Sequence, residues 1–139
     1  RLFQTTPNKV YAVPDLIRVW GPAAAWATVL YIISTLSGFG GVTSFPFADK
    51  LAHFVLYAVL GATLAWGWAR SPRVVSHGLV LVAGALYGVT DEWHQMHVPG
   101  RTPEMADWVA DVAGLLIGYW MMLRVVRRAS GNLEVEEAM

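Results

Sequence analysis

The residues able to do chemistry gather in two short stretches of the chain, at positions 49–53 and 91–111. Carboxylates and imidazoles can transfer protons, and lysine and arginine can hold a phosphate or a carboxylate. The cluster consists of Asp49, Lys50, His53, Asp91, Glu92, His94, Gln95, His97, Arg101, Glu104, Asp107 and Asp111. These residue types indicate a binding or catalytic site, or a network of ion pairs.

Side-chain chemistry suggests a division of roles within the cluster. The candidates for binding a substrate are Arg101, Lys50, Gln95, Asp49 and Asp111. The candidates for orienting a polar group or shuttling a proton are Asp91, Glu92, His53 and Asp107. No recognised catalytic motif is present in the sequence, so whether the protein is an enzyme stays open.

Acidic residues outnumber Lys and Arg in this cluster, six against two. An anionic ligand would meet net negative charge unless burial protonates some carboxylates or a divalent cation lies between them. Carboxylates and imidazoles without any cysteine suit Mg²⁺, Mn²⁺, Ca²⁺ or Zn²⁺. The spacing matches no known metal motif, so no residue is assigned as a metal ligand.

Helical spacing predicts which of these residues share a face. Asp49 and His53 are four residues apart and should lie on one face. One expected stripe consists of Gly84, Gly88, Asp91 and Gln95, and a second of Asp107, Asp111, Gly114 and Gly118. Small residues let helices approach closely in lipid, so each stripe would carry its carboxylates into an interhelical pocket. The intramembrane Asp111 then needs a partner, for which the candidates are Arg101, Lys50 and His53.

Membrane helices are the elements that must position this cluster. The 139 residues are 55% hydrophobic and 14% charged, against about 25% charged in soluble domains. Four apolar stretches predict spanning helices over 19–37, 51–68, 74–90 and 105–123, the first with Pro22 in its opening turn. We expect one all-α domain, an integral membrane four-helix bundle, preceded by an irregular segment 1–15 and followed by a mobile acidic tail over 129–139.

The charges also predict an orientation and exclude some partners. With four spans, eight of the ten Lys and Arg residues flank the side that holds both termini, which the positive-inside rule places in the cytoplasm. The polar cluster then faces outward. A net charge of zero offers no footprint for nucleic acid, and the absence of cysteine excludes disulfides and thiolate metal sites.

Ordered motifs connect the cluster to a known family. The strings are Asp49-Lys50-Leu51-Ala52-His53, Tyr87-Gly88-Val89-Thr90-Asp91-Glu92-Trp93-His94-Gln95 and Pro99-Gly100-Arg101, then Asp107, Asp111 and Gly114. Together they resemble the VanZ-like family of small bacterial membrane proteins, with Asp111 where many members have Asn. The resemblance implies a multi-pass protein of the bacterial inner (cytoplasmic) membrane with a link to the cell envelope and antibiotic resistance. It implies no established reaction.

Three functional interpretations stay open. The protein could bind a lipid or envelope-precursor head group at an outer-face pocket, either with or without modifying it. It could instead be a structural or accessory subunit of a larger membrane complex. The third interpretation, a small transporter, is weakened because the charges lie at one end of the helices and not at their middle. A purely structural explanation competes with all three: a buried salt-bridge network in which Arg101 forks to a carboxylate and Asp49 is a helix N-cap.

Overall fold

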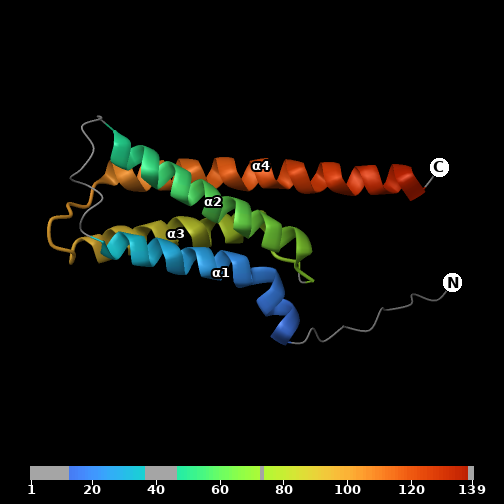
Figure 1. Cartoon of the computed structure of the whole chain (residues 1–139), viewed down its shortest axis with the longest axis horizontal. Coiled ribbons are helices and arrows are strands. Elements are labelled where there is room, and N and C mark those ends of the chain that lie inside the picture. The colour runs from blue at the N-terminus through green and yellow to red at the C-terminus, as the bar shows by residue number, and fades with distance from the viewer. Residues whose placement is uncertain (1–12, 37–46, 73, 138–139) are drawn as a thin grey trace.

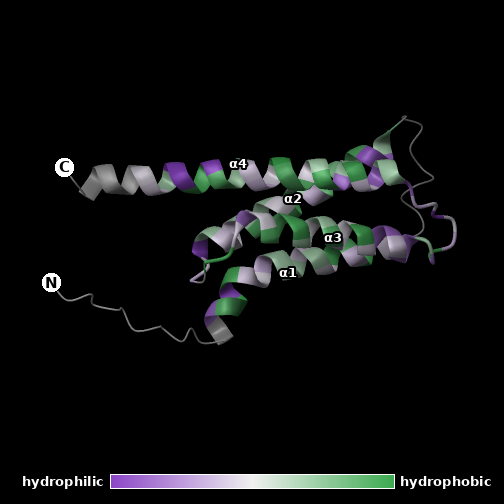
Figure 2. Cartoon of the chain, turned by 180° about the vertical axis from the view of Figure 1, so that it is seen from behind, coloured by the Kyte–Doolittle hydropathy of each residue, from purple (hydrophilic) through white to green (hydrophobic). Residues whose placement is uncertain are grey.

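The computed structural model describes residues 13–36, 47–72 and 74–137, which form four helices and no strand. These are α1 (Val13–Thr35), α2 (Ala48–Arg70), α3 (His77–Gln95) and α4 (Met105–Glu137). Successive helices run antiparallel, so the end of α1, the start of α2, the end of α3 and the start of α4 lie together (Figure 1). Figure 2 shows hydrophilic residues toward both ends of the bundle, and the end at which these four helix ends meet is here called the polar end. The expected all-α helical bundle is confirmed.

Three of the helices are long and apolar enough to cross a membrane: Asp15–Thr35, Ala48–Arg70 and Met105–Gly131. The exception is α3, whose 19 residues include three glycines and a polar last turn that lower its hydropathy. At 1.5 Å per residue it is about 28 Å long, close to the bilayer core of about 30 Å, and it packs against the other three helices. A fourth span through α3 therefore stays a prediction.

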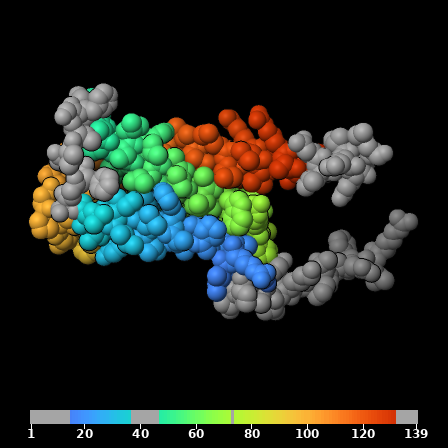
Figure 3. Space-filling view, in the orientation of Figure 1, coloured from blue at the N-terminus to red at the C-terminus, as the bar shows by residue number. Residues whose placement is uncertain are grey.

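Several helix ends differ from those predicted. α1 begins at Val13, before the predicted start at 19, so Pro22 lies inside the helix and not in its first turn. Proline removes a backbone hydrogen bond and bends a helix. Figure 1 shows a bend in α1 near its N-terminal end. α4 continues to Glu137, so most of the expected tail over 129–139 is helical, and α4 extends past the other helices (Figure 3). The mobility of that segment stays a prediction.

Close contact between α2 and α4 depends on glycine. A Cβ atom added at Gly114 would overlap the carbonyl of Phe54, and one at Gly118 would overlap the carbonyl of Ala58. In return, a Cβ at Gly61 of α2 would overlap the backbone of Leu115. The predicted small-residue stripe of α4 therefore packs directly on the α2 backbone, which brings the polar first turns of these two helices face to face.

Side chains with polar tips join the other helices by bonding to backbone carbonyls. Trp26 Nε1 of α1 donates to the Leu56 carbonyl of α2 at 2.9 Å. Tyr87 Oη of α3 donates to Ala27 of α1 at 2.6 Å, and Trp108 Nε1 of α4 donates to Ala85 of α3 at 3.1 Å. Such bonds satisfy the polar tips inside an apolar bundle. They hold α3 beside α1 and α4, and so place its last turn at the polar end.

Candidate functional site

The predicted stripes of α3 and α4 are both buried in the bundle. On α3 the buried residues include Gly84, Gly88, Asp91 and Gln95. On α4, Asp107 and Asp111 are 5% and 1% exposed. Their carboxylates therefore point into the bundle, as the spacing predicted, and each must find its partner there.

Lys50 of α2 lies among three carboxylates. Its Nζ is 3.1 Å from Asp49 Oδ2, 2.8 Å from Glu104 Oε2 and 3.0 Å from Asp107 Oδ1. The side chain of Asp107 is 7% exposed, whereas those of Asp49 and Glu104 are 40% and 52% exposed. Since exposed pairs contribute little and buried ones much more, the bond to Asp107 should dominate. Lys50 thus joins α2 to the start of α4 and is not free to hold an anion.

His53, one turn further along α2, is the partner of Asp111. Its Nδ1 lies 2.9 Å from Asp111 Oδ1, and both side chains are buried. Another turn along, Tyr57 donates from its hydroxyl to Asp91 Oδ2 on α3 at 3.5 Å. The second carboxylate oxygen in each acid, Asp111 Oδ2 and Asp91 Oδ1, is buried without a hydrogen-bond partner.

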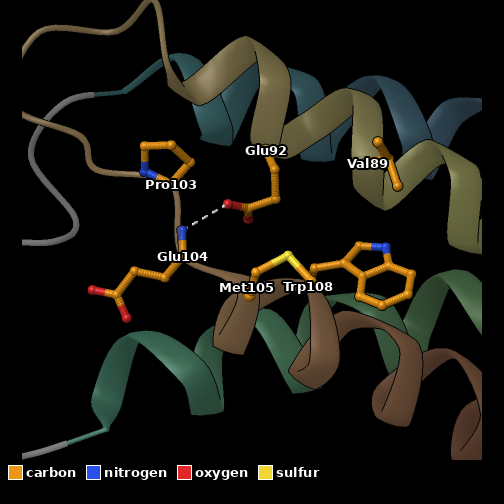
Figure 4. Close-up of a pocket in the computed structure, with 6 residues that line it drawn as sticks. All are labelled: Val89, Glu92, Pro103, Glu104, Met105 and Trp108. Atoms are coloured by element: carbon orange, nitrogen blue, oxygen red, sulfur yellow. Dashed lines mark hydrogen bonds between the residues drawn. The ribbon is translucent and has the colours of Figure 1, made fainter.

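Asp91 and Glu92 belong to the last turns of α3, outside the three membrane-spanning segments. Burial raises the pKa of Asp91 above its usual value, and the Ser34 hydroxyl opposes this rise. Burial likewise raises the pKa of Glu92 to about 7, against an opposing effect of the His53 imidazole. Glu92 Oε2 accepts the backbone N–H of Glu104 at 3.2 Å (Figure 4), while Oε1 is buried without a partner. Burial therefore affects the ionisation of these two acids more than the neighbouring imidazoles do.

Arg101 stands apart from the carboxylates. It follows Gly100, whose φ of 82° lies in the left-handed region that glycine adopts without strain. Its Nη2 donates to the Leu36 carbonyl beyond the end of α1 at 3.3 Å, and its Nε is buried without a partner. Among the described residues it forms no ion pair, so the fork to a carboxylate expected of a structural network is not present there.

Two pockets flank the cluster. The Arg101 pocket, of about 340 Å³, is lined by Leu30, Ile33, Ser34, Ala48, Asp49, Ala52, His53, Val55, Leu56, Tyr57, Asp91, Gln95 and Arg101. The Trp108 pocket, of about 290 Å³, is lined by Val89, Glu92, Pro103, Glu104, Met105 and Trp108 (Figure 4). The first combines a cation, two carboxylates and hydrogen-bonding groups with an apolar wall from α1 and α2. The second is almost wholly apolar apart from its acids.

The sequence candidates thus separate by position. Lys50 binds Asp49, Glu104 and Asp107, whereas Arg101, Gln95, His53 and Asp91 share the Arg101 pocket. Asp49 is not the N-cap of α2, because Phe47 holds that position with φ 69° and Asp49 lies inside the first turn.

Two polar residues of the Arg101 pocket were missed from sequence, Ser34 and Tyr57. Tyr57 could have been found, since it continues the four-residue spacing of Asp49 and His53 on α2. Ser34 could not, because no charged residue on α1 marks the face that turns toward the cluster.

Comparisons with known proteins agree with the membrane fold. A family model described as VanZ/LLP1 matches residues 4–127. The chain is also similar to an uncharacterised protein of Schizosaccharomyces pombe, with 33% identity over 86 residues, which are 62% of this chain and 53% of that protein. The aligned part therefore spans about half the length of that relative. No solved structure matches the chain.

Proposed function

Since the chain belongs to the VanZ/LLP1 family and carries helices able to span a membrane, we propose that it binds the anionic head group of a lipid or lipid-linked precursor in the Arg101 pocket. The Arg101 guanidinium supports this best. It lines the pocket, makes no ion pair with a described residue, and keeps Nε without a partner. A guanidinium offers paired N–H donors that match two oxygens of a phosphate.

Lys50, the other cation of the polar end, has a different role in this proposal. Three carboxylates surround its ammonium group, so a phosphate there would have to displace Asp107 from a buried ion pair. Because the Lys50 side chain is 24% exposed, breaking this pair should cost about 1–3 kcal/mol, less than the loss of a fully buried pair. Arg101 can bind an anion without that cost, and Lys50 is therefore better explained as a structural residue.

The rest of the Arg101 pocket suits an amphipathic ligand. Its volume of about 340 Å³ falls within the range of small-molecule sites. Leu30, Ile33 and Val55 provide an apolar wall, and Ser34 and Gln95 provide hydrogen-bonding groups beside Arg101. Val55 is 51% exposed on the outside of the bundle, so acyl chains could continue along α2 in the bilayer. A phospholipid with its phosphate next to Arg101 and its acyl chains along α1 and α2 would contact both the polar groups and the apolar wall of this pocket.

The orientation predicted from Lys and Arg would place this pocket at the outer face of a bacterial cytoplasmic membrane. Similarity to a yeast protein favours a ligand class that fungal membranes also contain. A phospholipid meets that condition, whereas a precursor of the bacterial wall does not. The proposal therefore centres on an anionic phospholipid.

The test compares Arg101→Gln with Arg124→Gln, a matched charge removal at an exposed position in the second half of α4, which does not line the pocket. Each delipidated protein is mixed with phosphatidylglycerol or phosphatidylcholine in detergent, and bound lipid is measured by native mass spectrometry. Charge-assisted hydrogen bonds are worth about 1.5–3 kcal/mol, so we expect Arg101→Gln to lower phosphatidylglycerol affinity about 10–100-fold. Arg124→Gln should bind like the wild type. Unchanged binding by a folded Arg101→Gln protein would refute the proposal.

A further inference from the structure

Three carboxylates deep in the polar end each leave one oxygen uncompensated. Asp91 Oδ1, Glu92 Oε1 and Asp111 Oδ2 are all buried without a hydrogen-bond partner in the described parts of the chain. The three acids come from two helices, α3 and α4, and meet at the face of α2 that carries His53 and Tyr57. Buried carboxylates without partners are unfavourable, so something must supply positive charge or donors to them.

Neither cation of the polar end supplies that charge. Lys50 is committed to Asp49, Glu104 and Asp107. Arg101 donates to the Leu36 carbonyl and forms no ion pair in the described part of the chain. The imidazole of His53 does reach one of the buried acids, since its Nδ1 lies 2.9 Å from Asp111 Oδ1.

The geometry around His53 points to a metal ion. His53, Glu92 and Asp111 each offer one ligand atom, and these three atoms lie within 4.8 Å of one another. Asp111 is 1% exposed, and its free Oδ2 belongs to this group of residues. We propose that His53 of α2, Glu92 of α3 and Asp111 of α4 form a binding site for a divalent metal ion.

The donor set selects among the divalent ions. An imidazole nitrogen favours Zn²⁺ or another transition metal over Mg²⁺ and Ca²⁺, and two carboxylates also suit Mn²⁺. The chain has no cysteine that would favour softer ions. Three protein ligands leave at least one coordination position for water or a ligand, as in open zinc sites. Zn²⁺ and Mn²⁺ are therefore the ions that this site should hold.

The position of the site would also give a bound ion a structural role. His53 lines the Arg101 pocket, Glu92 lines the Trp108 pocket, and Asp111 of α4 contacts His53 of α2. One ion would therefore tie together the three helices that meet at the polar end. None of its ligands is Arg101 or Lys50, so the metal site adjoins the proposed anion site at His53 but does not use the cation that would hold the anion.

The experiment uses the full chain, free of any histidine tag and stripped with a chelator, and adds ZnCl₂ or MnCl₂ alone. Bound metal is measured by isothermal titration calorimetry and, after dialysis, by inductively coupled plasma mass spectrometry. The wild type should hold one ion per chain and gain thermal stability. Glu92→Gln should weaken metal binding by about tenfold or more, because a charged ligand is lost.

Matched variants keep the result interpretable. Glu104→Gln removes an acid of the same type that binds Lys50, and should bind metal like the wild type. Asp111→Asn should also lose the metal. If its buried Asn prevents folding, Glu92→Gln alone decides whether the metal site exists. Arg101→Gln should keep the metal, so a failed anion site and a failed metal site can be told apart. A wild type that binds neither ion, or a folded Glu92→Gln protein that binds both normally, would overturn the proposal.

Discussion

At the scale of single residues, the acids of the polar end differ in what balances their charge. Asp107 is balanced by Lys50 at 3.0 Å, and Asp111 faces the neutral or charged imidazole of His53 at 2.9 Å. Glu92 accepts one backbone N–H and leaves its other oxygen without a partner. The six acids of the polar end therefore divide into two sets. One set surrounds Lys50 and is structural, and the other still needs a cation.

Lys50→Met tests the structural set. The variant keeps the length of the side chain but leaves Asp107 buried without its cation, which should lower the free energy of unfolding by about 1–3 kcal/mol. Glu104→Gln is the control, because the Glu104 side chain is 52% exposed and its pair should contribute less than about 1 kcal/mol. Chemical unfolding in mixed micelles measures both. Equal, small losses would show that Lys50 does not hold α2 and α4 together.

Which side chains of the polar end contact one another was only partly predictable from the sequence. Four-residue spacing correctly placed Asp49 beside His53 and Asp107 beside Asp111, because helical geometry determines which residues share a face. Arg101 meets the Leu36 carbonyl and no described carboxylate. This pairing depends on the path of the 96–104 connection, which helical spacing does not determine.

At the scale of the helices, glycine allows α2 and α4 to approach until side chains at their polar ends meet. Gly114 and Gly118 lie against the backbone of Phe54 and Ala58, and the same register brings Asp111 to His53. The stripe was predictable because glycine recurs at helical spacing. The extent of α4 was not, since the charge of its last residues suggested a tail although Ala, Leu and Glu favour helix.

Gly118→Ala tests this contact. The new methyl group would overlap the Ala58 carbonyl, so the helices must separate, and we expect a loss of about 1–3 kcal/mol. Gly131 lies on the same helix, and a Cβ added there would meet no neighbouring atom within 4 Å. Gly131→Ala should therefore raise the free energy of unfolding by up to about 1 kcal/mol through helix propensity. Thermal unfolding in detergent, followed by circular dichroism, measures both changes. A Gly118→Ala protein as stable as the wild type would contradict the close packing.

At the scale of the whole molecule, the zero net charge conceals two ends of opposite sign. Six acids and two of the ten Lys and Arg residues belong to the polar end, while five of the other eight lie in the described parts of the chain, toward the opposite end. Three helices meet the requirements for a span, and α3 runs beside them over a similar length (Figure 1). If α3 also crosses the membrane, the polar end faces outward and both termini face the cytoplasm.

Single cysteines test this topology directly, because the chain has none of its own. Thr102→Cys probes the connection from α3 to α4, and Val74→Cys and Ala129→Cys probe the opposite side, all at exposed positions. A membrane-impermeant maleimide should label Thr102→Cys in intact cells, and the other two only after lysis. Labelling of Thr102→Cys and Val74→Cys from the same side would show that α3 does not cross.

The central claim is that the polar end holds two separate sites, an anion site at Arg101 and a metal site at His53, Glu92 and Asp111. The most direct measurement determines lipid phosphorus and bound metal in the same purified samples of wild type, Arg101→Gln and Glu92→Gln, each supplied with phosphatidylglycerol and Zn²⁺. We predict that Arg101→Gln loses phosphorus and keeps zinc, and that Glu92→Gln loses zinc and keeps phosphorus. If neither variant loses its own ligand, or if either loses both while remaining folded, the two-site account is wrong.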